Sequence, residues 1–198
     1  EKLQQLGGRV LACSDSQGDV YDPDGIDLPT LRQVKEVERT TLQAYAGYRG
    51  GAVHHPRGNI WEVPTELALP CATQNELAAA DARMLVANGC LAVAEGANMP
   101  TTPEGLEVLR AGGVLFGPGK AANAGGVATS ALEMQQNAAR DSWTFAHTEA
   151  KLAEIMSSIH EQCAVTAEAY GRPGDYVLGA NVAGFVRVAD AMVALGLI

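Results

Sequence analysis

The chain has 198 residues, of which 47% are hydrophobic and 19% are charged, and its formal net charge is -9. This length suits one generous α/β domain or two small ones, whereas the acidic charge and the lack of a Lys/Arg stripe exclude sequence-independent nucleic-acid binding. The apolar runs are short and interrupted, so the sequence predicts no transmembrane helix, no secretory segment and a cytoplasmic location.

Short apolar runs alternate with helical stretches up to Phe116, which is typical of a parallel sheet covered by helices. A first strand is expected at 9–13, followed by an amphipathic helix at 29–46 and a weak strand signal within 51–61. The clearer strands and the helices that connect them are predicted at 66–69, 75–88, 91–95, 103–111 and 114–116.

Only helical patterns follow Phe116, so the sheet is expected to end there. The predicted helices span 127–141, 148–170 and 176–195.

Ligands of open α/β sheets bind outside the carboxyl ends of the strands. The residues that directly follow each predicted strand are therefore the first candidates for a site, and all of them are small, polar or glycine-rich. They are Ser14-Asp15-Ser16, Pro70 to Asn75, Gly96-Ala97-Asn98, and Gly117 to Asn123.

The junction around Gly125 and Gly126 is unusual because neither residue has a Cβ, which lets a planar ligand approach the backbone. A helix is expected to begin directly after them. Val127 and Ser130 would then share one face of its first turn, where free N–H groups favour a carboxylate or phosphate. The junction therefore predicts a site for a small polar substrate.

Two phosphate-binding motifs are excluded at this junction. Gly117 to Ala122 matches the dinucleotide-binding pattern G-x-G-x-x-A, and Asp141 lies at about the distance of the acidic residue that binds ribose in that motif. However, no second strand precedes Asp141, and Pro118 lacks the N–H that should face a phosphate. A P-loop is excluded because Val114 replaces its first glycine and Ala121 replaces its Ser or Thr.

Several polar side chains allow both a functional and a structural interpretation. Asp15 could accept a hydrogen bond from a ribose hydroxyl, or it could only shape a turn. Lys35 and Arg39 lie one helical turn apart and could reach a 2′-phosphate, or they could only solvate a helix face. Asn98 and Asn123 both donate and accept hydrogen bonds, which suits a carboxamide or ribose.

The histidines and cysteines predict no metal site. His54 and His55 are adjacent in an extended segment, so their side chains would point to opposite faces. The four cysteines lack metal-ligand spacing and are expected to be reduced thiols packed as small apolar residues, at Cys13, Cys71, Cys90 and Cys163.

A family resemblance rests on four long ungapped stretches, Leu69 to Leu77, Ala94 to Thr102, Phe116 to Asn137 and Gly179 to Phe185. Together they resemble the cofactor-binding half of the small hexameric glutamate dehydrogenases, and the bacterial NADP-dependent branch is the most similar. The resemblance implies a Rossmann-like, doubly wound, mostly parallel sheet that lacks its first strand and is followed by a helical segment. Residues 1–120 would form a truncated dinucleotide-binding domain, and 121–198 a helical segment with a substrate-facing loop and hinge helices.

The same resemblance implies the role of each candidate. Ser14, Asp15 and Ser16 would lie at the adenosine ribose of NADP, or alternatively NAD, with Lys35 and Arg39 as phosphate partners. The path of the dinucleotide would be lined by Ala72, Thr73, Gln74, Gly96 and Asn98. Asn123 would contact the nicotinamide side, while Val127 and Ser130 would touch the glutamate side chain, with Ser130 selecting glutamate over apolar amino acids.

The implied reaction converts L-glutamate, NADP and water to 2-oxoglutarate, ammonia and NADPH in a homo-oligomer, a hexamer by resemblance. Family members are more than twice this long, and the residues that transfer protons in them match no position of this sequence. We therefore assign no catalytic residue here and expect the 198 residues alone to be inactive. Two alternatives stay open, namely a dehydrogenase for apolar amino acids and a non-catalytic segment that acts only in binding or assembly.

Overall fold

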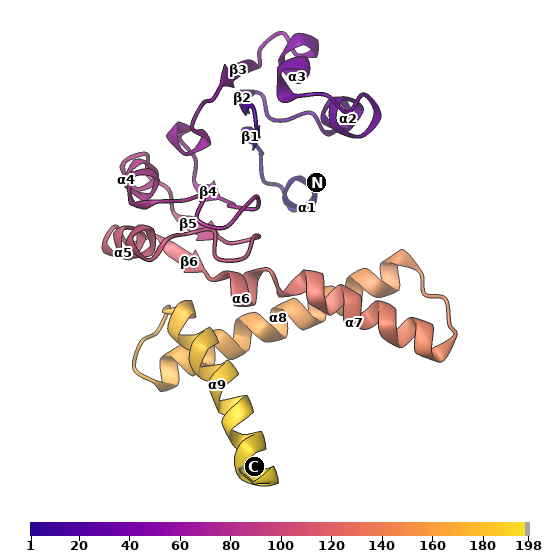
Figure 1. Cartoon of the computed structure of the whole chain (residues 1–198), viewed down its shortest axis with the longest axis vertical. Helices are drawn as coiled ribbons and strands as arrows, with labels where there is room; N and C mark the ends of the chain where they lie inside the picture. The colour runs from indigo at the N-terminus through magenta and orange to yellow at the C-terminus, as the bar shows by residue number, and fades with distance from the viewer. Residues whose placement is uncertain (197–198) are drawn as a thin grey trace. The chain divides into compact units, whose positions relative to one another are not determined.

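A computed structural model describes residues 1–196, which form two compact units (Figure 1). Unit 1 comprises residues 1–65 and 87–89, and unit 2 comprises 66–86 together with the described residues from 90 onward. This division differs from the domains expected at 1–120 and 121–198. Those domains were defined by function rather than compactness and stay a prediction.

Unit 1 contains three short strands, a π-helical turn, a 3-10 turn and three short α-helices. In chain order they are α1 (Lys2–Gln5), β1 (Ala12–Asp15), β2 (Gly18–Tyr21), α2 (Leu28–Arg32), the π-helical η1 (Gln33–Val37), α3 (Leu42–Tyr48), β3 (Val53–Pro56) and the 3-10 helix η2 (Ile60–Glu62).

The sheet of unit 1 is antiparallel, which corrects the expectation of a parallel arrangement in this part of the chain. Its strand order is β1-β2-β3, and Asp15 pairs with Gly18 across a tight hairpin. Gly18 has a φ of 146°, and a Cβ there would lie 2.2 Å from the carbonyl oxygen of His55. Strand β2 was missed because the polar residues before it were interpreted as a loop.

The single helix expected at 29–46 is interrupted. It consists of α2, the π-helical turn and α3, and the chain leaves helical geometry between Glu38 and Thr41. Arg39, within this break, has a φ of 51°, a left-handed conformation that ends a helix.

The core of unit 1 combines an apolar cluster with two buried carboxylates, Asp19 and Asp22, of which Asp22 bonds to the cluster through Tyr45. Tyr45 is fully buried, and its hydroxyl donates to Asp22 Oδ2 at 2.8 Å while accepting from the backbone N–H of Asp27 at 2.8 Å. Arg49 Nε donates to the same Asp22 oxygen at 3.1 Å. Burial acts to raise the pKa of the Asp22 carboxyl, but these hydrogen bonds together outweigh it and hold the pKa below its usual value. The apolar members of the cluster are Val20, Ile26, Val34, Leu42 and Tyr45.

Unit 2 begins with a parallel sheet and continues into long helices. Its elements are β4 (Leu67–Ala68), α4 (Ala79–Ala87), β5 (Ala92–Ala94), α5 (Pro103–Ala111), β6 (Leu115–Gly117), α6 (Gly119–Ala122), α7 (Ala124–Ala139), α8 (Phe145–Ala169) and α9 (Tyr176–Leu195). Strand order is β4-β5-β6, with Ala68, Val93 and Phe116 in register across the three strands. The expected parallel strands and connecting helices are confirmed here, so the chain is an α/β protein.

Helices α4 and α5 lie next to each other along this sheet (Figure 1). A Cβ on Gly112, at the end of α5, would come within 2.6 Å of the Val86 side chain in α4. Helix α4 begins later than expected, because Asn75 has a φ of 59° and the chain makes a bridge at Leu77 before the helix starts. The two connecting helices therefore pack closely against each other.

The last three helices pack through α8, which contacts both α7 and α9. A Cβ on Gly179 in α9 would lie 2.0 Å from the carbonyl oxygen of Cys163 in α8, so glycine permits their close approach. Helix α9 is long and apolar enough to cross a membrane by length and composition alone, a test that core helices of soluble proteins also pass. By that test the expectation that every apolar run is too short is wrong for α9.

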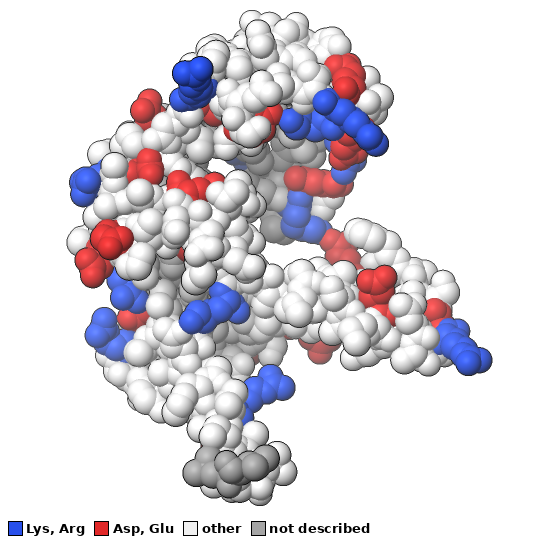
Figure 2. Space-filling view, in the orientation of Figure 1, with Lys and Arg blue, Asp and Glu red and all other residues white. Residues whose placement is uncertain are grey.

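Charged side chains are dispersed on the face shown in Figure 2. Lys and Arg atoms appear there as separate small groups among Asp and Glu atoms. This distribution agrees with the acidic composition and offers no extended cationic surface on that face of the described residues.

We predict that Asp22→Asn destabilises unit 1 by about 1–3 kcal/mol at neutral pH, since a charged hydrogen-bond acceptor is lost. Because the folded pKa of Asp22 is depressed, its contribution is present above the unfolded pKa of about 4 and is lost as the pH falls through the folded value. Urea unfolding followed by Trp61 fluorescence in a Trp143→Phe background should therefore show the difference at neutral pH and its disappearance in strong acid.

The exposed neighbour Asp24 supplies the matched control for this experiment. Asp24→Asn should leave the unfolding midpoint nearly unchanged at both pH values. An Asp22→Asn effect of equal size in acid and at neutral pH would contradict the assignment to the ionised carboxyl.

Candidate functional site

An open pocket of about 370 Å³ lies where the loops after β4 and β5 meet in unit 2. The two strands are parallel neighbours, so their carboxyl ends lie at the same edge of the sheet. Five of the candidates chosen from the sequence line this pocket together with Cys71 and Ala97, namely Ala72, Thr73, Gln74, Gly96 and Asn98.

Backbone hydrogen bonds hold the two loops against each other. The N–H groups of Gly96 and Ala97 both donate to the Pro70 carbonyl oxygen, at 2.9 and 3.1 Å. Glycine at position 96 leaves room for the Cys71 side chain, because a Cβ there would lie 2.4 Å from Cys71 Sγ and would force that side chain to move. The two loops are therefore packed closely where they line the pocket.

The first loop is also fixed from its own side. Glu76 Oε1 accepts hydrogen bonds from the N–H of Ala72 at 2.8 Å and of Thr73 at 3.4 Å. This arrangement leaves the side chains of Thr73 and Gln74 exposed at the pocket.

The Asn98 loop meets the chain that follows β6 through a pair of amide side chains. Asn123 Nδ2 donates to Asn98 Oδ1 at 2.8 Å and to the Ala97 carbonyl oxygen at 3.2 Å. Within residues 1–196 this leaves Asn98 Nδ2 as a donor and Asn123 Oδ1 as an acceptor with no hydrogen bond inside the protein. Such a donor and acceptor pair matches the hydrogen-bonding needs of a carboxamide.

The glycine junction before the substrate candidates is helical, which corrects the expectation of a loop there. Helix α7 begins at Ala124, so Gly125 and Gly126 belong to its first turn and Ser130 to its second. Ser130 is exposed and its hydroxyl donates to the Gly126 carbonyl oxygen at 3.3 Å, while Val127 is 72% exposed. The side chains of Val127 and Ser130 remain accessible. The N–H groups that lack a partner at the start of α7 belong to residues that precede Val127 in the sequence.

The ribose candidates lie in unit 1, at the end of β1. Asp15 Oδ2 accepts from Lys35 Nζ at 2.8 Å and from the N–H of Leu42 at 3.3 Å, and Asp15 Oδ1 accepts from the N–H of Gln17 at 2.9 Å. Burial acts to raise the pKa of the Asp15 carboxyl, but the Lys35 and backbone hydrogen bonds outweigh it and lower the pKa. Asp15 is therefore ionised, and Lys35 compensates its charge.

The other ribose and phosphate candidates are exposed around this ion pair. Ser14 and Ser16 flank Asp15, and both are exposed. Arg39 lies in the break after the π-helical turn, exposed and with no hydrogen bond or ion pair within residues 1–196. The structure thus brings Lys35 to Asp15 and leaves the Arg39 guanidinium available.

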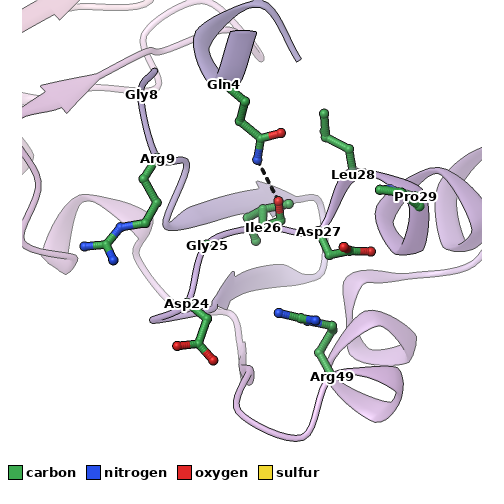
Figure 3. A pocket seen from close by; sticks show the side chains of 10 residues that line it. All are labelled: Gln4, Gly8, Arg9, Asp24, Gly25, Ile26, Asp27, Leu28, Pro29 and Arg49. Atoms are coloured by element: carbon green, nitrogen blue, oxygen red, sulfur yellow. Dashed lines mark hydrogen bonds between the residues drawn. The ribbon is translucent and has the colours of Figure 1, made fainter. Parts of the chain in front are cut away.

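A second pocket, of about 460 Å³, contains none of the candidates chosen from the sequence (Figure 3). Its polar side chains largely hold unit 1 together. Gln4 Nε2 donates to the Ile26 carbonyl oxygen at 2.7 Å, Asp27 caps α2, and Arg49 pairs with Asp22. We assign no ligand to it.

Sequence reasoning missed one residue of the site, Glu95. It is 6% exposed, and its carboxylate contacts both the Asn98 loop and the segment after β6. A glutamate at the end of the apolar run 91–94 was the available signal, because a charged residue is rarely buried without partners.

A family model described as glutamate/leucine/phenylalanine/valine dehydrogenase matches residues 1–196. The chain belongs to this dehydrogenase family.

Bacterial relatives include two proteins named NADP-specific glutamate dehydrogenase. The Haemophilus influenzae protein is 52% identical over 99% of this chain, and the Escherichia coli protein is 50% identical over 100% of it. A solved glutamate dehydrogenase of Plasmodium falciparum superimposes with a TM-score of 0.95 at 40% identity, over 100% of this chain and 43% of its own. The chain spans about half the length of the curated relatives, 44% of each bacterial protein.

We predict that Cys71 is the first thiol to react with iodoacetamide, because it is exposed at the pocket. Burial and the nearby Glu76 also raise the pKa of the Cys71 thiol. Burial raises the pKa of the Cys13 thiol to about 11, so roughly one molecule in a thousand carries that thiolate near pH 8. Cys90 and Cys163 are buried. Peptide mass spectrometry over a time course measures the order in which the thiols are modified. Cys71→Ser is expected to remove the rapid phase of modification. Modification of Cys13 before Cys71 would contradict the described conformation of the Cys71 loop.

Proposed function

We propose that this chain is part of a glutamate dehydrogenase that converts L-glutamate, NADP and water to 2-oxoglutarate, ammonia and NADPH. The observation that carries the proposal is the contact between the Asn98 and Asn123 side chains beside the pocket at the carboxyl ends of parallel strands. The names of the bacterial relatives support the cofactor and the substrate.

In this proposal the chain's own residues bind and orient. NADP, when bound, supplies the group that accepts hydride. Asn98 and Asn123 would hold the carboxamide of the cofactor through their remaining donor and acceptor, and so fix which face of the ring is presented to substrate. The loops after β4 and β5 would line the dinucleotide with Ala72, Thr73, Gln74 and Gly96.

The adenosine end would be held by Ser14, Asp15 and Ser16. A free carboxylate beside the ribose would repel a 2′-phosphate, but Lys35 lies 2.8 Å from Asp15 and compensates its charge. Arg39 then adds an exposed cation close in sequence to this ion pair. Charge compensation at Asp15 therefore supports NADP over NAD.

Substrate choice would depend on α7. We assign the Ser130 hydroxyl to the γ-carboxylate of glutamate and Val127 to its methylene groups. The bond from Ser130 to the Gly126 carbonyl is long, at 3.3 Å, so the hydroxyl can rotate and donate to a substrate instead. An enzyme for apolar amino acids would have no use for this donor.

We also propose that the enzyme is a cytoplasmic homo-oligomer, with a hexamer as the family resemblance suggests. The second half of α9 is apolar and accessible, with Val188 59% and Val193 84% exposed. Arg187 and Asp190 lie in the same half and are exposed, and burying both in a bilayer would be costly. These exposed apolar side chains would be buried against protein in an oligomer, which supports assembly rather than membrane insertion.

We expect no turnover by the 198 residues alone, because none of them is assigned a proton-transfer role. Substrate choice is therefore tested in a full-length enzyme that contains this chain. Ser130→Val should lower kcat/KM for glutamate about 10- to 100-fold, as expected for the loss of one hydrogen bond to a charged group, and should favour leucine. Steady-state rates with both amino acids measure the change.

Thr129→Val is the matched control, since Thr129 is the neighbouring hydroxyl on α7 and bonds the Gly125 carbonyl oxygen at 2.8 Å. That variant should keep the wild-type preference. If Ser130→Val retained full glutamate activity, the assignment of Ser130 to the γ-carboxylate would be wrong, and the alternative of an apolar substrate would gain support.

A further inference from the structure

Glu95 is a buried carboxylate between the two segments that form the amide contact. Oε2 accepts from the N–H of Gly119 at 2.6 Å, and Oε1 accepts from the N–H of Thr101 at 3.2 Å. The Glu95 backbone N–H also donates to the Gly117 carbonyl oxygen at 3.0 Å. One residue thus joins the end of the Asn98 loop to the start of α6.

The two hydrogen bonds stabilise a carboxylate whose burial is costly. Among the described residues no Lys or Arg pairs with Glu95, so two backbone N–H groups provide its stabilisation. A buried carboxylate without a cation is costly, and the short distance to Gly119 is typical of a charge-assisted hydrogen bond.

The loop that Glu95 closes has a backbone conformation that needs support. Met99, next to Asn98, has a φ of 49° and is 63% exposed, so its own side chain does little to fix the loop. Left-handed conformations of such residues persist only where surrounding contacts determine them. The Glu95 bond to Thr101 is one of those contacts, at the far end of the loop from Gly96.

The other bond places the amide partner. Gly119 begins α6, which ends with Asn123 at its C-cap. A Cβ on Gly119 would lie 2.9 Å from the Ala97 carbonyl oxygen and 3.2 Å from Glu95 Oε2, so glycine lets this backbone approach both. Holding the Gly119 N–H therefore sets how near Asn123 comes to Asn98.

We propose that Glu95 is a positioning residue for the cofactor site: its two oxygens hold the Asn98 loop and the Gly119–Asn123 segment so that the amide contact forms. The part of the proposal that concerns NADP rests on the proposed function. The part that concerns the amide contact stands on the geometry alone. Glu95 acts through Asn98 and Asn123 and touches neither substrate nor cofactor itself.

The test uses Glu95→Gln in the 198-residue chain. A glutamine of the same shape can accept from one N–H, but its NH2 group must then face the other donor. We expect the Gly119 amide to exchange with solvent at least tenfold faster, the side-chain amide resonances of Asn98 and Asn123 to shift, and NADP to bind at least tenfold more weakly. Glu95→Asp keeps the charge but is one methylene shorter, so it should lose one of the two bonds and give smaller changes.

Glu107→Gln on α5 is the matched control, because it removes the same charge from an exposed position. It should leave the exchange rate, the two asparagine resonances and NADP affinity unchanged. Unaltered Asn98 and Asn123 resonances in a folded Glu95→Gln chain would overturn the proposal.

The wild-type chain gives a readout that needs no variant to fold. Gly119 and Lys120 are the first two residues of α6, whose N–H groups have no partner inside the helix. Because Glu95 accepts from Gly119, the Gly119 amide should exchange at least tenfold more slowly than that of Lys120, and equal rates would also overturn the proposal. Absence of NADP binding to wild type would count against the proposed function, while the exchange and resonance readouts would still decide the role of Glu95.

Discussion

The carboxyl ends of β5 and β6 lie side by side because the two strands are parallel, and the candidate site depends on this geometry. The loop after β5 and the segment after β6 leave the sheet at one edge, where the Asn98 and Asn123 side chains come within 2.8 Å. An antiparallel pair would send these two segments to opposite edges. The same parallel register lets Glu95, at the end of β5, reach the N–H of Gly119 after β6. Sheet topology thus accounts for the amide contact and for the buried carboxylate that supports it.

In unit 1, by contrast with Glu95 in unit 2, carboxylates are paired with cationic side chains. Its buried Asp22 accepts a hydrogen bond from the Tyr45 hydroxyl and pairs with the Arg49 guanidinium, which stabilises the core. Its more accessible Asp15 is paired with Lys35, which leaves a carboxylate able to accept from a ribose while reducing its repulsion of a phosphate. The acidic chain can therefore present a local environment suited to an anionic cofactor, without a basic surface of the kind nucleic-acid binding requires.

The secondary structure was predicted most accurately where several local sequence signals agreed. Helix α5 was expected at 103–111 and has those bounds, because Thr102 caps it, a proline begins it and its apolar residues follow the helical period. Prediction from the sequence failed where tertiary contacts determine the local structure. Strand β2 is paired through a hairpin that its own composition does not indicate. Helix α7 begins before Gly125, although glycine disfavours a helix. The pocket loops were found because small polar residues follow buried strands. Glu95 was missed because its partners are two backbone N–H groups, one six and the other 24 residues further along the chain, which composition does not reveal.

We propose that the loops around Asn98 and the Asn123 segment form the nicotinamide end of an NADP site. Titration of the isotope-labelled chain with NADP, followed by backbone and side-chain amide NMR, would decide this. We expect saturable shifts at Ala72 to Gln74, at Gly96 to Asn98 and at the Asn123 side chain, with few changes in the Arg9 and Asp24 pocket of unit 1. Shifts confined to that other pocket, or no saturable shifts at Asn98 and Asn123, would contradict it.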